Sequence, residues 1–339
     1  MQTLSATNHI HPLFADLERL YAILSEKRDD SARLWEQSIN VCFKPITALF
    51  ERYTTFQWHL RESTTSYEPL KLNLKKSKNI LLAYSGGKDS TATAIWLRDH
   101  KYNVTLYHLH GINQTYKDEW KTAQAMAEKL KLPIVIEDIH IRGAHSYIEH
   151  PMKNMVIASR MLEYGIREGL TSQIAFGNFS TSSLNSDPFE VCGGDCNEMW
   201  RTYERVVQTI IPEFEVLTPL ENMKDTLDIL LQHKDIAVGC QSCIGPYRYR
   251  DYLHRNNVKK YNIDLPEKRC GSCWKCCLEY IVYTDNDMYK YSRNFYKHCL
   301  DVLKRTLYQE EGVKYSIEQT WGHYFFYSKE KSKYFTESA

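Results

Sequence analysis

Between about residue 77 and residue 177, the hydrophobic residues follow two alternating patterns. Strands are predicted at 80–84, 104–109, 134–136 and 173–177, and the first of them is a short, uninterrupted apolar run, which is typical of a strand buried on both faces of a parallel sheet. Apolar residues recur at helical spacing between these strands, from Asp89, around Trp120, Ala123, Ala127 and Leu130, and across 155–162. This alternation predicts right-handed crossovers and an α/β fold with a doubly wound parallel sheet.

The segments on either side of this region have a different character. Residues 1–77 contain two helical patterns, the second interrupted at Lys44-Pro45, so we expect a helical N-terminal extension. The tyrosine-rich C-terminal residues predict an ordered, packed extension that could bind a protein partner. We expect four parts: the extension 1–77, an α/β domain 78–235, a cysteine-containing module 236–283 and an aromatic-rich extension 284–339.

Net charge gives no argument for a nucleic-acid partner. The chain has 43 Lys+Arg against 42 Asp+Glu, which leaves a net charge of +1. The lysines at 71, 75, 76 and 78 could contact a polyanion, although such a cluster is more often a solvated edge.

No apolar run is long enough to span a bilayer, and the N-terminus lacks the regions of a signal peptide. We therefore expect a cytoplasmic protein with no membrane contact.

The stretch Tyr84-Ser85-Gly86-Gly87-Lys88-Asp89-Ser90 joins the first predicted strand directly to a helix. In such a turn, glycines let backbone N–H groups point outward at an anion, and the helix start adds partial positive charge. The turn therefore predicts a phosphate site, the alternative being a glycine turn without a ligand. A Walker A loop is excluded, because Lys88 is followed by Asp89 and no glycine precedes Gly87 at the required distance.

Other candidate residues follow the remaining strands. Ligands of a doubly wound sheet lie beyond the carboxyl ends of its strands, where Ser85, His110-Gly111 and Gly177-Asn178 are expected. The polar loop 178–196 predicts either a disordered lid or an active-site loop. Within it, Asp195 could cap the helix predicted at 198–210, contact a substrate or hold Mg²⁺.

Six of the 10 cysteines cluster in one region: Cys240, Cys243, Cys270, Cys273, Cys276 and Cys277. In a reducing compartment this clustering indicates a metal rather than disulfides, and two-residue spacers let thiolates converge on one Zn²⁺. We select Cys243, Cys270, Cys273 and Cys276 as ligands, with Cys240 and Cys277 as substitutes; the rival interpretation is an iron–sulfur cluster. The insert between Cys243 and Cys270 alternates aromatic and cationic residues, which could stack on bases, grip a peptide or pack against the metal module.

Together, these motifs resemble a known family. The hexapeptide 85–90 resembles the SGGxDS loop of the PP-loop ATP pyrophosphatases. With the downstream Cys and Cys-x-x-Cys-x-x-Cys, it resembles 7-cyano-7-deazaguanine synthase, the QueC-like branch of that superfamily. Three further segments are similar: Pro151-Met-Lys153-Asn154, Gly193-Gly-Asp195-Cys-Asn-Glu198, and Leu217-Thr-Pro-Leu220 with Lys224. The resemblance covers about residues 79–283.

The resemblance implies an ATP-dependent carbon–nitrogen ligase that adenylates 7-carboxy-7-deazaguanine, releases pyrophosphate and forms an amide and then a nitrile. It implies that the turn, with Ser85, Gly86, Gly87 and Ser90, binds the departing pyrophosphate, that Lys153 is a point charge on phosphate, and that Asp89 orients the turn or Mg²⁺. It places Tyr84, Lys88, His110, Gly111 and Gly177 at the nucleotide. Asn178, Asp195, Glu198 and Lys224 would contact the deazapurine. ATP, Mg²⁺ and Zn²⁺ are the implied cofactors.

The chain departs from the family at several places, so the nitrogen acceptor stays open. Gly111 is followed by Ile-Asn-Gln, Lys153 replaces an arginine, and Lys224 is displaced by one position. The acceptor could be ammonia or, as in an anti-phage system, a protein amine reached through the two extensions. Two other functions are a tRNA-thiolating PP-loop enzyme that uses Cys192 and Cys196, and a scaffold without catalysis.

Overall fold

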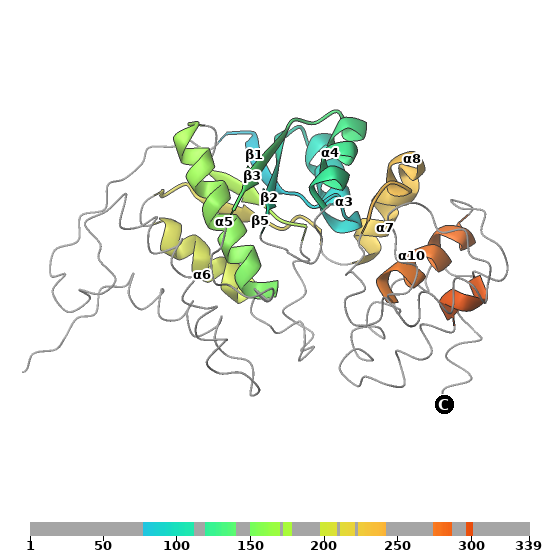
Figure 1. Cartoon of the computed structure of the whole chain (residues 1–339). Coiled ribbons are helices and arrows are strands. Elements are labelled where there is room, and N and C mark those ends of the chain that lie inside the picture. The colour runs from blue at the N-terminus through green and yellow to red at the C-terminus, as the bar shows by residue number, and fades with distance from the viewer. Residues whose placement is uncertain are drawn as a thin grey trace, which may run out of the picture.

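The structure of the chain is a computed structural model, shown in Figure 1. It describes residues 77–111, 119–139, 150–169, 172–177, 197–208, 211–220, 223–241, 274–286 and 296–300. The predicted N-terminal extension, the polar loop, most of the cysteine module and most of the C-terminal extension lie outside these residues. The predictions made for those segments therefore remain predictions.

A five-stranded sheet forms the centre of the described structure, with the strand order β3-β2-β1-β4-β5 and parallel pairing throughout. The strands are β1 (Asn79–Ala83), β2 (Asn103–His110), β3 (Ile134–Asp138), β4 (Gln173–Ala175) and β5 (Glu215–Leu217). The four predicted strands are confirmed, with slightly different ends. Strand β5 was not predicted, because only one of its three residues is buried and no apolar run marks it.

The helices alternate with the strands, as predicted. They are α3 (Lys88–Asp99), α4 (Glu119–Leu130), α5 (His150–Arg167), α6 (Asn197–Gln208), α7 (Met223–Gln232), α8 (Lys234–Ala237) and α10 (Trp274–Asp285). The chain runs from β1 through β2 to β3 on one side and then crosses back to place β4 beside β1. This reversal between β1 and β4 is the switch point of a doubly wound sheet.

Side chains on β1 alternate between two hydrophobic layers. Ile80, Leu82 and Tyr84 belong to one core cluster with residues of α3, α4, α7 and α8. The neighbouring strand contributes Leu106 to that cluster, whereas the adjacent Tyr107 faces Tyr164 of α5 across 5.8 Å. Helices α3 and α4 therefore cover one face of the sheet and α5 covers the other, as Figure 1 shows.

The second layer is held by an aromatic cluster and a buried carboxylate. Trp200 of α6 packs on Phe176 at 4.4 Å, and the Tyr203 hydroxyl lies 3.3 Å from Ser159 of α5. The carboxylate of Glu204 accepts the backbone N–H of Val216 at 2.7 Å, which fixes β5 against α6. Helix α6 is thereby anchored to both the sheet and α5.

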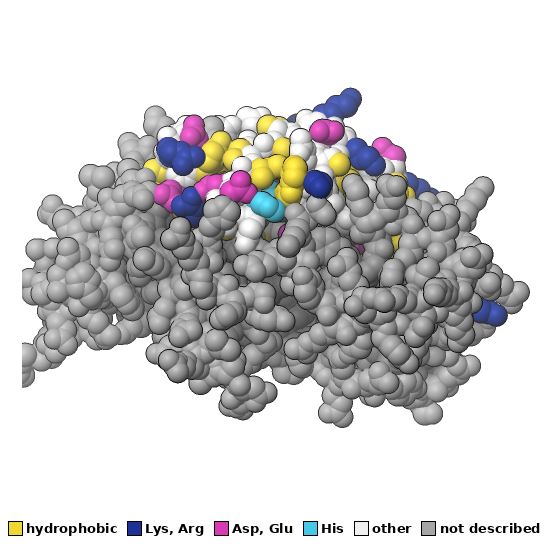
Figure 2. All heavy atoms as spheres, in the orientation of Figure 1, with side chains coloured by type: hydrophobic (Ala, Val, Ile, Leu, Met, Phe, Trp, Pro, Cys, Tyr) yellow, Lys and Arg dark blue, Asp and Glu magenta, His cyan; other side chains and the backbone are white. Residues whose placement is uncertain are grey.

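The described part of the surface carries mixed charge. Figure 2 shows one face on which acidic, basic and hydrophobic side chains are interspersed, and its described residues form no basic patch. No described helix is both long and apolar enough to cross a membrane.

Candidate active site

The turn between β1 and α3 requires glycine at its centre. Gly86 has φ of +75°, a left-handed conformation that residues with a side chain rarely adopt. A Cβ atom there would lie 3.0 Å from Thr122 Cγ2 and 3.1 Å from the backbone nitrogen of Ala123, so α4 leaves room only for hydrogen. The first turn of α4 thus packs directly against this turn, which we call the phosphate turn (Ser85–Ser90).

Hydroxyl and amide groups of the phosphate turn face one another. The Gly87 N–H donates to Ser85 Oγ at 3.3 Å, and the hydroxyl oxygens of Ser85 and Ser90 are 3.4 Å apart. Ser90 Oγ also donates to the Gly87 carbonyl at 3.3 Å. No described side chain caps α3, whose N-cap residue is Gly87. The turn therefore gathers two hydroxyls and an amide at the positive end of a helix, the donor set that suits an oxyanion.

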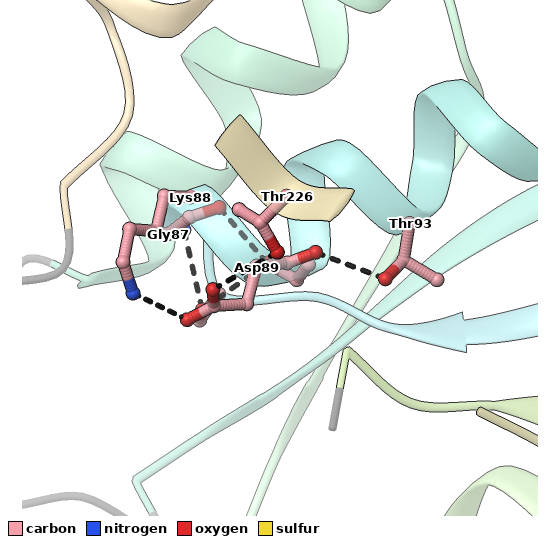
Figure 3. Close-up of polar contacts among 7 residues, drawn as sticks. Gly87, Lys88, Asp89, Thr93 and Thr226 are labelled. Atoms are coloured by element: carbon pink, nitrogen blue, oxygen red, sulfur yellow. Dashed lines mark hydrogen bonds and ion pairs between the residues drawn. The ribbon is translucent and has the colours of Figure 1, made fainter. Parts of the chain in front are cut away.

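Two charged residues follow in the first turn of α3. Lys88 Nζ lies 2.7 Å from Asp89 Oδ2, and the side chains are 5% and 31% exposed, respectively. Thr226 of α7 donates to the other carboxylate oxygen of Asp89 at 3.5 Å. Figure 3 shows Asp89 between Lys88 and Thr226, and Thr93 bonded to its backbone oxygen. The carboxylate is the more accessible member of the pair, so it is the group that could reach a cation.

The end of β4 completes the site. A Cβ atom on Gly177 would lie 2.7 Å from the Ser90 nitrogen, so the chain leaving β4 passes directly against the start of α3. The phosphate turn and Gly177 consequently lie together at the switch point between β1 and β4. Ligands bind at this place in doubly wound sheets.

An aromatic pair marks the carboxyl end of β2. The half-buried rings of His110 and Trp120 meet edge to face, with centroids 6.2 Å apart. Gly111 follows with φ of +86°, and a Cβ atom there would clash with the carbonyl oxygen of Ile139. Trp120 was predicted only as an apolar position of a helix. Its contact with His110 at the carboxyl end of β2 makes it a candidate wall of the site.

Buried hydrogen bonds of Tyr84, the residue before the phosphate turn, support the turn. The Tyr84 hydroxyl lies 3.0 Å from Thr91 Oγ1, and its carbonyl oxygen lies 2.8 Å from His108 Nδ1. Burial raises the pKa of the Tyr84 phenol well above its usual value, the neighbouring Cys240 adding to the effect. Tyr84 therefore stays neutral and serves as a structural support.

The structure places the other predicted site residues less completely. Lys153 is on α5, Glu198 on α6 and Lys224 on α7, but their side chains are outside the described atoms. The backbone of Lys224 is two residues from Thr226, so α7 begins close to Asp89. Asn178 and Asp195 lie outside the described residues.

The predicted zinc ligands lie mostly outside the described residues as well. Of the four, only Cys276 is described; it is buried on α10 beside the buried Cys277. Cys240, a substitute ligand in the sequence analysis, is buried in the core cluster with its thiol 3.8 Å from the Ile236 carbonyl. Within the described residues, no three His, Cys, Asp or Glu side chains converge on a point.

Sequence reasoning missed three residues that the fold brings to the phosphate turn: Thr122, Thr226 and Gln241. Thr226 and Asp89 are 137 positions apart, and Thr122 and Gln241 are 119 positions apart. Thr122 and Thr226 occupy ordinary helical positions, so no local pattern distinguishes them. The only sequence signal near Gln241 is its place after Cys240 in a cysteine motif, and that motif indicates metal binding rather than contact with the phosphate turn.

Comparison with known proteins agrees with this geometry. Residues 54–171, which include the phosphate turn, match the family model of the PP-loop domain. A 7-cyano-7-deazaguanine synthase from Sulfolobus acidocaldarius is 22% identical over 239 residues, which cover 64% of this chain and 48% of the relative. A tRNA(Ile)-lysidine synthase from Lactococcus lactis subsp. lactis is 42% identical over 67 residues, which cover 18% of this chain and 16% of the relative.

The chain spans about half the length of the first relative and a smaller part of the second. Neither relative is named as a thiolating enzyme, so the comparisons do not favour the tRNA-thiolation alternative.

Proposed function

Because the chain is a QueC-like member of the PP-loop family, we propose that it is an ATP-dependent carbon–nitrogen ligase. Its substrate is 7-carboxy-7-deazaguanine or a close analogue. The carboxylate is adenylated with release of pyrophosphate and then passed to a nitrogen nucleophile, giving an amide or the nitrile 7-cyano-7-deazaguanine.

One observation carries the proposal: the phosphate turn lies at the switch point between β1 and β4, with its hydroxyls and amide gathered at the start of α3. A carboxylate oxygen is a poor leaving group until it is joined to the phosphorus of AMP as an acyl-adenylate. In the first step, a carboxylate oxygen attacks the α-phosphorus of ATP, and the bond from that phosphorus to the bridging oxygen breaks. Negative charge then develops on the departing pyrophosphate, where fixed donors stabilise it.

The roles of the described residues follow from this step. Ser85, Gly87 and Ser90 donate hydrogen bonds to the pyrophosphate, with Gly86 permitting the turn. Lys88 exchanges its bond to Asp89 for a phosphate oxygen, and the released, more accessible carboxylate of Asp89 is suited to hold Mg²⁺. Magnesium would neutralise phosphate charge when bound.

His110, Gly111 and Gly177 border the nucleotide at the carboxyl edge, and Trp120 adds an aromatic surface for a base. We assign four residues to the binding of the deazapurine acid: Asn178, Asp195, Glu198 and Lys224. Lys153 is assigned as a point charge on phosphate. Cys243, Cys270, Cys273 and Cys276 are proposed as a structural zinc site, of which the buried Cys276 thiol is the described member.

The acceptor is tested directly by product analysis. The full chain is incubated with 7-carboxy-7-deazaguanine, ATP, Mg²⁺ and ¹⁵N-labelled ammonium, and the products are analysed by mass spectrometry. We expect a deazapurine amide or nitrile that contains one ¹⁵N, formed only with ATP. Failure to convert the acid with ammonium present would contradict ammonia as the acceptor. Mass added to a protein amine instead would support the conjugating alternative.

A further inference from the structure

Two residues from separate parts of the chain, Thr122 and Gln241, meet at Gly86. The backbone N–H of Gln241 donates to the Gly86 carbonyl at 3.0 Å. The side-chain carbonyl of Gln241 accepts the hydroxyl of Thr122 at 3.2 Å. The methyl carbon of Thr122 is also the atom that a Cβ atom built on Gly86 would approach most closely, at 3.0 Å. Gly86 is therefore held by a strand turn, a helix and a distant loop together.

The bond to the Gly86 carbonyl fixes more than Gly86. This carbonyl and the N–H of Gly87 belong to one planar peptide unit, which is trans, so the two groups point in opposite directions. Because Gln241 holds the carbonyl on one side, the Gly87 N–H is directed to the other, where it meets Ser85 Oγ at 3.3 Å. Gln241 thus selects the orientation in which Gly87 presents a donor to the site.

A peptide between two glycines is the type most easily turned over, since neither neighbour has a Cβ atom to restrict it. Turning this unit over would aim the Gly86 carbonyl at the site and withdraw the Gly87 N–H. A carbonyl oxygen repels a phosphate oxygen, whereas successive N–H groups in a turn bind one. The same turn would then lose its affinity for an anion without unfolding.

The backbone of Gln241 is well anchored for this task. It follows Cys240, which is fully buried and whose N–H donates to the Ala237 carbonyl at 3.0 Å. Gly239 lies so close to α4 that a Cβ atom there would be 2.6 Å from Met126 Sδ. The donor to Gly86 therefore projects from a segment packed against the same helix that supplies Thr122.

We propose that Gln241 is a positioning residue that holds the Gly86–Gly87 peptide in its anion-binding orientation, with Thr122 as its side-chain partner. The inference rests on the proposed function, because it assumes that the phosphate turn binds the pyrophosphate of ATP. It gives Gln241, a residue of the predicted cysteine-containing module 236–283, a role in the ATP site.

The test measures the dissociation constant of inorganic pyrophosphate with Mg²⁺ by calorimetry on the full chain. Gln241→Leu and Thr122→Val each remove one side of the side-chain bond while preserving size. Thr122→Ser is the conservative variant, because it keeps the hydroxyl. We expect the leucine and valine variants to weaken pyrophosphate binding about fivefold, the effect of losing one hydrogen bond, and Thr122→Ser to bind within about twofold of the wild type.

Gln241→Pro removes the backbone donor itself and is expected to weaken binding by about tenfold or more. Thermal midpoints of the leucine and valine variants should stay within about 5 °C of the wild type, since one hydrogen bond at a half-buried residue contributes little to stability. The double variant Thr122→Val with Gln241→Leu should bind no worse than either single variant, because both remove the same bond.

The inference is overturned if the leucine and valine variants bind pyrophosphate as the wild type does, or if their losses add in the double variant. A conservative variant that fails to restore binding also overturns it. These outcomes leave the proposed function intact as long as the wild type binds pyrophosphate. A folded wild type that binds no pyrophosphate rejects the proposed function itself, and this inference with it.

Discussion

The Lys88 ammonium is paired with the Asp89 carboxylate at 2.7 Å, one residue away in the first turn of α3. The lysine side chain is almost fully buried, whereas the aspartate side chain is accessible. The pair therefore keeps the positive charge of Lys88 at the start of α3, beside the phosphate turn. In the proposed function, Lys88 would pass to a phosphate oxygen and the carboxylate of Asp89 would then be available to Mg²⁺.

Asp89→Asn is expected to lower kcat/KM for ATP by about 100-fold, because the variant cannot neutralise a bound cation. Its free energy of unfolding should also fall, by about 1–3 kcal/mol, because the almost fully buried Lys88 ammonium loses the neighbouring negative charge. Steady-state pyrophosphate release and urea unfolding measure the two effects. Asp99→Asn is the matched control: Asp99 is an exposed aspartate, paired with Arg98 at 3.3 Å, at the far end of the same helix. If Asp89→Asn kept full activity, Asp89 would have no role in binding or turning over ATP.

Gly177→Ala should damage the site and the fold together. The new methyl carbon would lie 2.7 Å from the Ser90 nitrogen and 2.9 Å from the Asp89 carbonyl carbon, both backbone atoms that cannot rotate away. Shifting the start of α3 should reduce stability by about 1–3 kcal/mol and lower ATP turnover measured well below the melting temperature.

Gly169→Ala provides the control for that experiment. Gly169 has φ of +61° but no atom within 4 Å of the added methyl position, so its cost is conformational only, about 1 kcal/mol. Turnover by Gly169→Ala should equal that of the wild type. Equal turnover by Gly177→Ala would mean that the end of β4 does not shape the site.

Glu204 is expected to be the critical residue for the placement of β5. Its buried carboxylate accepts the Val216 N–H at 2.7 Å and also contacts Arg201, so Glu204→Ala leaves a buried donor without its acceptor. The free energy of unfolding should fall by about 1–3 kcal/mol. Glu204→Gln, which keeps an acceptor oxygen, should recover most of it. The exposed Glu168, bonded to Arg167, is the control, and Glu168→Ala should unfold at the wild-type urea concentration.

Stability should decline in alkali because several of the described tyrosines are buried. Burial raises the pKa of Tyr84, Tyr107 and Tyr203 above the ordinary value of 10.0. Above pH 10 the unfolded chain loses these protons while the folded chain keeps them, so stability is full below about pH 10 and is lost as pH rises toward the raised values. Urea midpoints at successive pH values should fall beyond pH 10. Tyr84→Phe should fall less steeply, and a flat profile would contradict the burial of these phenols.

Much of the fold was predictable because the strands near the site are buried on both faces and show as apolar runs. Ile80–Leu82 is such a run, and it leads directly into the glycines of the phosphate turn. β5 was not predictable, since Val216 is its only buried residue and its support comes from Glu204, a polar residue on another element.

The phosphate turn itself could be predicted because its residues are consecutive in the sequence. Its supports could not. Thr226 reaches Asp89 and Gln241 reaches Gly86 only after α7 and α8 have packed beside α3 and α4. Tertiary packing brings these contacts together, and threonine or glutamine at a single position carries no periodic signal.

The identity of the nucleotide product tests the central claim most directly. The full chain is supplied with 7-carboxy-7-deazaguanine, ammonium, Mg²⁺ and ATP labelled at the α-phosphorus, and the label is followed by chromatography. A phosphate turn that binds the departing diphosphate predicts labelled AMP, with one pyrophosphate released for each AMP formed. Labelled ADP with orthophosphate would show cleavage at the other phosphoanhydride bond and would contradict the account.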